Sequence, residues 1–365
     1  MKNIWIFCLI LVAPYFSIAQ KTEQVQSDTT LNNQVLGEVS ETFNPEGFFD
    51  SDEPLKITLK YDITSFIKNK SKAEYMDAEL IVYNKNEAPV TKNIRIMARG
   101  NFRKGQCYFP PLFLNFKTDT IKRTELQGMN KIKVVTHCTT GKNNDLIVLK
   151  EYLAYKLYNI LTEKSFRVRL LDITYIDTGK KQHQYQEMGF VIEPVGLVAK
   201  RNNCVLVDPM VVRGVNIVEE DADRSALFQY MISNTDWRFK SGHNTKFMKS
   251  LTDITSKVIA VPYDFDFSAF VDASYAFPQS WSTSESLFQR DYLGYCRNND
   301  EDYLKNIRFF AGKKEKIMST IANFSYLPES EIKDCSKFVN EFFNDISNEK
   351  SIVFSIKNQC RPIDF

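Results

Sequence analysis

The stretch that decides the fold runs from residue 234 to residue 266 and contains three polar blocks: Asn234-Thr235-Asp236, His243-Asn244 and Pro262-Tyr263-Asp264-Phe265-Asp266. Between the last two blocks, apolar segments at 245–248 and 257–261 flank a polar run at 250–256, which is the pattern of a β-hairpin. Antiparallel pairing centred on residue 253 places residue 244 opposite residue 262. Asn244 is therefore expected beside Asp264, with Asp236 in the loop that leads to the same end of the hairpin.

These side chains carry the oxygen ligands that Mg²⁺ prefers. Asp264 and Asp266 are two residues apart, so an extended chain would point both to one face, with Cα atoms ~7 Å apart. Their neighbours are apolar, and a buried carboxylate needs a cation or hydrogen-bond donors. We therefore predict that Asn244, Asp264 and Asp266 hold a divalent cation. The alternative is a solvated turn whose carboxylates have no ligand.

The same layout occurs in the phosphoryl-transfer sites of kinases. There one Asp accepts the hydroxyl proton, an Asn holds a metal ion, and a second Asp after a hairpin holds the metal ions. In this pattern Asp236 is the predicted catalytic residue.

Composition restricts the alternatives. The 365 residues are 43% hydrophobic and 13% aromatic, which is enough for the core of one large or two modest domains. The net charge of +2 gives no reason to expect a nucleic-acid partner. With three histidines and no GxSxG, GxGxxG or Walker P-loop pattern, a His-based zinc site, a hydrolase and a dinucleotide-binding protein lack support.

The N-terminus reads as a secretory signal peptide over residues 1–19. Lys2 precedes the apolar segment 4–16, and Ser17-Ile18-Ala19 fits a cleavage site. A short membrane anchor is the alternative. We expect export to the periplasm, cell surface or medium, with no stable membrane span after cleavage.

Six cysteines remain after residue 19, and an exported chain permits disulfides between them. Cys107 and Cys138 each lie at the end of a predicted strand and are the favoured pair. Cys335 lies on the apolar face of a predicted helix, where it can serve as a core residue.

Residues 20–53 are polar and are predicted to be a flexible leader. Residues 54–365 are predicted to form one domain, with a β-rich part at 54–140 and an α/β part at 141–365. Periodicity predicts strands at 55–61, 78–83, 93–99, 112–116, 132–136, 168–176 and 189–192, and helices at 146–160, 222–233, 303–324 and 329–346. The expected fold class is α+β, with a mostly antiparallel N-terminal sheet followed by a helix-rich part.

Three further residues could contact a nucleotide. Arg99 precedes Gly100 at a strand end, where it could bind an anionic group or lie on the surface. Lys150 opens the first long helix and faces either a phosphate or solvent. Glu193 ends a strand before Pro194, where chains often enter ligand clefts.

Several segments between residues 55 and 270, taken in order, resemble the CotH kinase family of atypical secreted and spore-coat kinases. They are Arg99-Gly100-Asn101, 131–135, the helix opened by Lys150, 189–193 and the three polar blocks of 234–266. The polar blocks are similar to the family's Gly-Asn-x-Asp, Asn and Pro-x-Asp-x-Asp. Residues 107–112 and 137–138 look like a divergent branch of Bacteroidetes-type bacteria.

The resemblance implies an atypical protein-kinase-like fold and the use of Mg²⁺ or Mn²⁺ with ATP or another nucleotide. It implies a catalytic role for Asp236, metal binding by Asn244, Asp264 and Asp266, and a position of Glu193 near the nucleotide. Two departures stand out. The family's Lys after Arg-Gly-Asn is missing here, or replaced by Arg103, Lys104 or Lys133. The Gly before Asn-x-Asp is Ser233.

The residues predicted to bind the nucleotide are Arg99, Lys133, Lys150 and Glu193. The first hypothesis is an exported kinase that transfers a phosphoryl group from a nucleotide to a hydroxyl of an unknown protein or small molecule. The second is a non-catalytic, pseudokinase-like binding module of the cell envelope. A third is a metal-dependent protein that binds glycan or peptide through the aromatic run 275–281, which core packing also explains.

Overall fold

The computed structural model describes residues 45–85, 88–116, 124–139, 145–179, 181–253 and 255–363. The predicted signal peptide, and the predicted leader up to residue 44, lie outside these residues.

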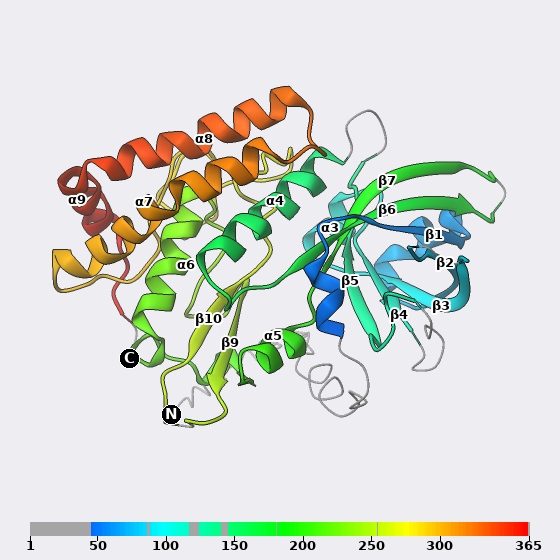
Figure 1. The fold of residues 1–365 in the computed structure, drawn as a ribbon, viewed down its shortest axis with the longest axis horizontal. Helices are drawn as coiled ribbons and strands as arrows, with labels where there is room; N and C mark the ends of the chain where they lie inside the picture. The colour runs from blue at the N-terminus through cyan, green and yellow to red at the C-terminus, as the bar shows by residue number, and fades with distance from the viewer. Residues whose placement is uncertain are drawn as a thin grey trace, which may run out of the picture.

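Seven strands form a closed barrel in the order β1-β2-β3-β4-β5-β7-β6, on the right of Figure 1. They are β1 (Leu55–Tyr61), β2 (Met76–Tyr83), β3 (Val90–Ala98), β4 (Leu112–Asn115), β5 (Lys131–Val135), β6 (Val168–Asp177) and β7 (Gln184–Ile192). All neighbours pair antiparallel except β1 and β6, whose parallel pairing closes the barrel.

The closed barrel corrects the expected N-terminal sheet. The five strands predicted before residue 140 are confirmed, but β6 and β7, which lie beyond that residue, complete the same barrel. Closure satisfies the backbone groups that the edges of an open sheet would expose. Alternate residues of β1, such as Ile57 and Leu59, are fully buried in the barrel core.

Short helical segments surround the barrel. They are η1 (Pro45–Asp50), α2 (Ile63–Asn69), η2 (Lys70–Lys72) and α3 (Phe102–Gln106). Asp62 begins α2 by accepting a hydrogen bond from the Ser65 N–H (2.8 Å), which satisfies one of the free N–H groups of the first turn.

A helical part with its own core lies on the left of Figure 1. Its helical segments are α4 (Leu146–Leu161), α5 (Val195–Arg201), η3 (Pro209–Val211), η4 (Gly214–Asn216), α6 (Glu219–Met231), α7 (Asp300–Ala322), α8 (Glu329–Ser347) and α9 (Glu349–Gln359). A three-stranded sheet in the order β10-β9-β8 accompanies them, with β8 (Cys204–Val207), β9 (Thr245–Ser250) and β10 (Ile259–Pro262). The fold class α+β is confirmed.

Helix α4 lies between the barrel and the helical part, in contact with β6, β7 and α7. Because it is covered from both sides, most of its side chains are buried, which explains its nearly continuous apolar sequence. It carries Glu151 and Tyr155, which are four residues apart and therefore on one face of the helix.

The predicted hairpin exists, but its register differs from the expected one. Thr245 pairs with Pro262, and the Tyr263 N–H donates to the Asn244 carbonyl (3.0 Å). The expected pairing of residues 244 and 262 is wrong by one residue, because the pairing centre falls between residues 253 and 254 rather than on residue 253. The sequence analysis also missed β8, which pairs with the other side of β9.

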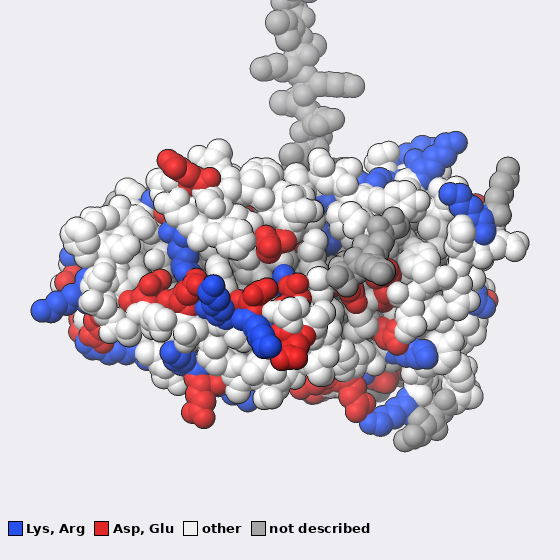
Figure 2. Space-filling model, turned by 90° about the horizontal axis from the view of Figure 1, so that it is seen from above, with Lys and Arg blue, Asp and Glu red and all other residues white. Residues whose placement is uncertain are grey.

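The described residues contain two disulfides. The predicted Cys107–Cys138 pair is confirmed, and Cys296–Cys360 joins the segment before α7 to the end of α9. Cys335 is buried with a free thiol, as expected for a core residue. Helices long and apolar enough to span a membrane are absent from the described residues. On the face seen in Figure 2, acidic and basic side chains are interspersed, with no broad patch of one sign.

Candidate active site

Asp236 lies in the loop between α6 and β9, where its carboxylate has two close partners. His243 Nε2 is 2.8 Å from Asp236 Oδ1, and Asn244 Nδ2 donates to Asp236 Oδ2 (2.9 Å) and to the Asp236 carbonyl (2.7 Å). The Asp236 N–H donates to Asn234 Oδ1 (3.0 Å). The loop is therefore held in shape by hydrogen bonds between its own side chains and backbone.

The electrostatic state of Asp236 follows from this arrangement. Burial raises the pKa of Asp236 above its ordinary value, and the charge of Asp264 acts in the same direction, while His243 and Asn244 oppose the rise. The hydrogen bond with Asp236 raises the pKa of His243. His243 is partly exposed, so this pair connects a mostly buried carboxylate to solvent.

Asp264 does not continue the strand. The strand β10 ends at Pro262, and Asp264 has a φ of 67°, in the left-handed region. The expectation that Asp264 and Asp266 share an extended segment is therefore wrong. The Asp264 N–H donates to the Tyr155 hydroxyl of α4 (2.8 Å), which holds the turn in place.

Asp266 is 3% exposed and accepts a hydrogen bond from the Tyr275 hydroxyl (2.8 Å). Burial, with a further contribution from the charge of Asp264, raises the pKa of Asp266 to about 7, and Arg103 opposes the rise. The two carboxylates are therefore close enough for the charge of Asp264 to change the pKa of Asp266, as expected for residues of one site. A carboxylate with this pKa is close to half protonated at neutral pH.

Arg103, on α3, is the buried cation of this region. Its Nη2 donates to the Thr136 carbonyl (2.6 Å), and its Nη1 lies 3.6 Å from Glu151 Oε2. Burial lowers the pKa of Arg103, but Tyr275, Asp266, Glu151 and Asp264 together raise it above its ordinary value. Arg103 is one of the three cations, with Lys104 and Lys133, that were considered as replacements for the Lys of the CotH pattern. Its charge interacts with both Asp264 and Asp266.

Glu151 is almost fully buried beside Arg103. Burial and the charges of Asp266 and Asp264 raise the pKa of Glu151, while Arg103 and Arg99 lower it. The predicted residue Arg99 therefore lies near enough to act on this cluster, and its guanidinium lies 5.7 Å from the centre of the Phe113 ring. Gly100 has a φ of 81°, so the predicted turn after Arg99 is confirmed.

Two further cations lie around the ring of Tyr263, the residue that precedes Asp264. The Lys133 ammonium, from β5 of the barrel, lies 6.0 Å from the ring centre, and the Lys246 ammonium, from β9, lies 5.5 Å from it. Lys133 was predicted to bind a nucleotide, whereas no role was predicted for Lys246. The two ammonium groups come from different parts of the fold, the barrel and the three-stranded sheet, and both lie around the ring of Tyr263.

Two predicted residues lie elsewhere. Lys150 forms an ion pair with Glu331 of α8 (2.6 Å). The Glu193 side chain is fully buried between Arg167 and Arg201, each with a nitrogen 3.0 Å from a Glu193 carboxylate oxygen. Both side chains are therefore engaged in ion pairs outside the Asp236–Asp264–Asp266 group.

The donor set can be compared with the needs of Mg²⁺ or Mn²⁺. Within the described ranges, no group of three His, Cys, Asp or Glu side chains is arranged to hold a metal ion. Two carboxylates, Asp264 and Asp266, remain with the Asn244 amide oxygen. Carboxylate and amide oxygens are the donors that a hard cation prefers, so the chemistry of these three side chains fits Mg²⁺ or Mn²⁺.

Three contacts of the site were not predicted from the sequence. They are Glu151 beside Arg103, His243 as the hydrogen-bond partner of Asp236, and Tyr275 as the hydrogen-bond partner of Asp266. The helical spacing of Glu151 and Tyr155 was visible in the sequence. The face of α4 that contacts the hairpin, however, depends on tertiary packing, which the sequence pattern does not show. Tyr275 was noted only as part of an aromatic run. Its hydroxyl bond to Asp266 depends on the turn after β10, which the sequence pattern treated as a strand.

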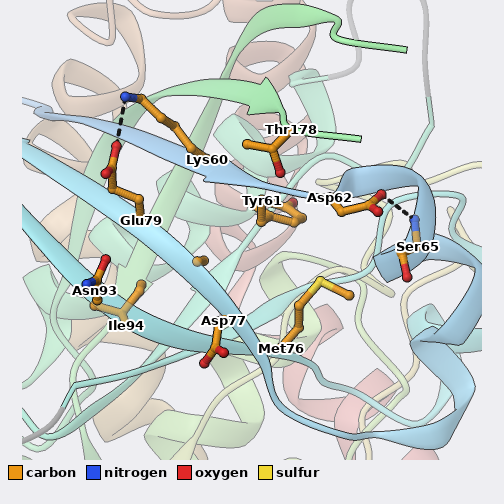
Figure 3. Close-up of a pocket in the computed structure, with 11 residues that line it drawn as sticks. Lys60, Tyr61, Asp62, Ser65, Met76, Asp77, Glu79, Asn93, Ile94 and Thr178 are labelled. Carbon is orange, nitrogen blue, oxygen red and sulfur yellow. Dashed lines mark hydrogen bonds and ion pairs between the residues drawn. The ribbon is translucent and has the colours of Figure 1, made fainter. Parts of the chain in front are cut away.

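A separate hollow of about 770 Å³ lies between β1, β2 and β3 (Figure 3). Its polar groups bond to one another: Lys60 pairs with Glu79 (2.7 Å), and Asp62 accepts from Ser65. None of the carboxylates around Asp264 lines this hollow.

Comparison with known proteins gives little. No family model and no curated protein matches the sequence. Among solved structures, the chain is similar to the Helicobacter pylori proinflammatory kinase CtkA, with 13% sequence identity and a TM-score of 0.39, over 70% of this chain and 94% of that one. A similarity of this size carries no argument about the fold or the activity of the chain.

Proposed function

We propose that the chain is an exported, kinase-like phosphotransferase of the CotH type, which moves a phosphoryl group from a nucleotide to a hydroxyl. The observation that carries the proposal is the placement of Asp236, held by His243 and Asn244, at the start of a hairpin whose other strand leads directly into Asp264 and Asp266. Two disulfides are consistent with the proposed export.

In the proposed reaction, the substrate hydroxyl oxygen forms a bond to the terminal phosphorus of the nucleotide. The bond from that phosphorus to its bridging oxygen breaks, and the nucleoside diphosphate leaves. The hydroxyl proton passes to the Asp236 carboxylate, from which His243 offers a path to solvent, since it is hydrogen-bonded and partly exposed.

The remaining residues would bind and position the nucleotide. Asn244, Asp264 and Asp266 would hold Mg²⁺ or Mn²⁺, which when bound would neutralise phosphate charge. Lys133 and Lys246, whose ammonium groups lie around the ring of Tyr263, would contact phosphate oxygens, in the role of the family's missing Lys. The positive charge of Arg103 would partly offset the negative charge of the buried carboxylates.

A second candidate is a non-catalytic nucleotide-binding module. It is favoured by the ion pairs of Lys150 with Glu331 and of Glu193 with two arginines, which occupy two of the four side chains predicted to contact the nucleotide.

The two candidates separate in one experiment on the purified full chain. Nucleotide binding is measured by calorimetry with and without Mg²⁺ or Mn²⁺, and transfer is measured with nucleotide labelled at the terminal phosphate. Asp264→Asn is expected to abolish cation-dependent binding, because it removes a charged ligand. Asp236→Asn is expected to retain binding and lower transfer by roughly 10²–10⁴-fold.

Asp253→Asn is the matched control, since Asp253 is an exposed carboxylate in the turn of the same hairpin. It should leave both measurements unchanged. Binding without transfer by the wild type selects the non-catalytic module. A wild type that neither binds nucleotide nor transfers phosphate would rule out both candidates.

A further inference from the structure

A cavity of about 350 Å³ opens at one end of the barrel. The start of α2, the segment after α3, the end of β5 and the turn between β6 and β7 line it, and Thr64, Tyr108, His137 and Tyr185 are among its lining residues. We call it the barrel-end cavity. Its size is within the range of small-molecule sites, and none of the carboxylates around Asp264 lines it.

The wall of the barrel-end cavity is an aromatic corner. His137 stacks on Phe109 (ring centres 4.4 Å apart, planes at 20°), and Tyr185 stacks on Tyr175 (5.1 Å, 21°). The planes of His137 and Tyr185 are at 89° to one another, with centres 5.8 Å apart. Two perpendicular ring stacks form a rigid apolar surface of the kind that accepts a further planar ring.

His137 also presents an unsatisfied polar atom. The residue is 1% exposed, and its buried Nδ1 has no hydrogen-bond partner. The buried hydroxyl of Tyr175, the ring on which Tyr185 stacks, has no partner either. Leaving such groups unsatisfied is costly, so two of them in one aromatic corner indicate that something else completes them.

The charge of the cavity argues for a neutral occupant. Burial, together with the positive charge of Arg103, lowers the pKa of His137 to about 4, so its imidazole is neutral at pH 7 and has one nitrogen that accepts a hydrogen bond. Charged lining residues of both signs are present, Lys181 with Asp177 and Glu187. The Asp177 carboxylate accepts from the Ile63 N–H (2.9 Å) and the Gly179 N–H (3.0 Å).

The Cys107–Cys138 disulfide shapes this wall. Tyr108 follows the first cysteine and His137 precedes the second, and the Phe109 N–H donates to the Cys138 carbonyl (3.1 Å). The covalent link therefore fixes the relative positions of two lining residues. A site held in this way is preorganised for a ligand.

We propose that the barrel-end cavity binds a small neutral aromatic molecule whose hydroxyl or amide N–H donates a hydrogen bond to the imidazole of His137. A volume of about 350 Å³ exceeds the roughly 150 Å³ in which an apolar protein cavity holds benzene, so a one- or two-ring compound fits. The proposal is independent of phosphoryl transfer.

Phenol and toluene are the probes, because they have the same size and differ in the hydroxyl. Each is titrated into the full chain, and its dissociation constant is measured by ligand-detected NMR. Thr64→Trp fills the cavity from an exposed position and should weaken phenol binding at least tenfold. Lys68→Trp, on an exposed position of α2 outside the cavity, should change nothing.

His137→Phe tests the hydrogen bond. It preserves a ring against Phe109 and should weaken phenol binding about tenfold while leaving toluene binding unchanged. If this variant does not fold, the Thr64→Trp result decides. Equal phenol binding by wild type and Thr64→Trp overturns the proposal. So does the absence of saturable phenol binding by the wild type, which would leave ordered water as the partner of His137.

Discussion

Three residues of the candidate active site, Ser233, Asn244 and Asp264, have left-handed backbones with φ of 49°, 49° and 67°. Side chains other than Gly adopt this conformation at a cost of about 1–3 kcal/mol, and such residues cluster at functional sites. The left-handed φ of Ser233 is one that Gly adopts without strain, so Ser is an unusual residue at this position. Its hydroxyl donates to the Leu287 carbonyl (2.8 Å), a bond that Gly could not make.

Asp266 makes stability depend on pH in a way that Asp266→Asn should remove. Its folded-state pKa is about 7 and its unfolded value is 3.8, so the folded chain holds a proton that the unfolded chain has lost between these values. Stability that is fully present below about pH 4 is therefore lost as pH rises toward 7. Relative to the wild type, Asp266→Asn should gain on the order of 3 kcal/mol between pH 4 and pH 8.

The measurement is urea unfolding of both proteins across this pH range. His243 contributes a loss of the same sign, because its folded pKa is raised, so only the difference between the two proteins isolates the site around Asp266. Asp253→Asn is again the control and should follow the wild type. Parallel curves for wild type and Asp266→Asn would show that the carboxyl titrates normally.

At the scale of elements, the sequence predicted what local periodicity encodes. The predicted strand at 55–61 coincides with β1, and the predicted helices at 303–324 and 329–346 begin and end within three residues of the bounds of α7 and α8. These elements have long apolar patterns with a clear period of two or of three to four. Short elements such as β8 and α3 were missed, because four or five residues do not define a period.

The site was predictable only in part, for a related reason. Asp236 and Asn244 lie eight residues apart, and their contact follows from the loop before the hairpin. Glu193 and Lys150 were assigned by position along the chain, and their actual partners, Arg201 and Glu331, are fixed by tertiary packing. The closure of the barrel through β1 and β6 is also non-local, and no pattern within either strand indicates it.

The Cys296–Cys360 disulfide should stabilise the C-terminal helices. It spans a sequence separation of 64, and Arg361 forms backbone bonds with Cys296 and Gly294 (2.9 and 2.8 Å) beside it. By loop-closure entropy, replacing both cysteines by Ser should lower the free energy of unfolding by up to about 4 kcal/mol. Chemical denaturation measures the loss, and Cys335→Ser, which removes a free thiol, is the control for burial of a hydroxyl. A double variant as stable as the wild type would show that the backbone bonds alone suffice.

At the scale of the whole molecule, the buried residues form two separate clusters, one in the barrel and one in the helical part. The chain enters the barrel at β6, just after Arg167, and leaves it at the end of β7, just before Glu193. The ion pair of Glu193 with Arg167 therefore joins the two segments that connect the barrel to the helical part. Arg201, at the end of α5, connects the same carboxylate to the helical part. It also donates to the carbonyls of Glu163 and Ser165 (2.7 Å each). This junction holds one buried carboxylate against two guanidinium groups.

Glu193→Gln should therefore uncouple the two parts. Removing the carboxylate charge leaves two mostly buried guanidinium groups facing one another, which should cost about 3–5 kcal/mol. The matched control is Glu163→Gln, because Glu163 is 90% exposed and lies 3.5 Å from the same Arg201, where an exposed pair contributes at most about 1 kcal/mol. Scanning calorimetry should show a calorimetric enthalpy that exceeds the van't Hoff enthalpy for Glu193→Gln, as two parts unfold in separate steps. One cooperative transition, unchanged from that of Glu163→Gln, would mean that packing along α4 rather than this junction couples the barrel to the helical part.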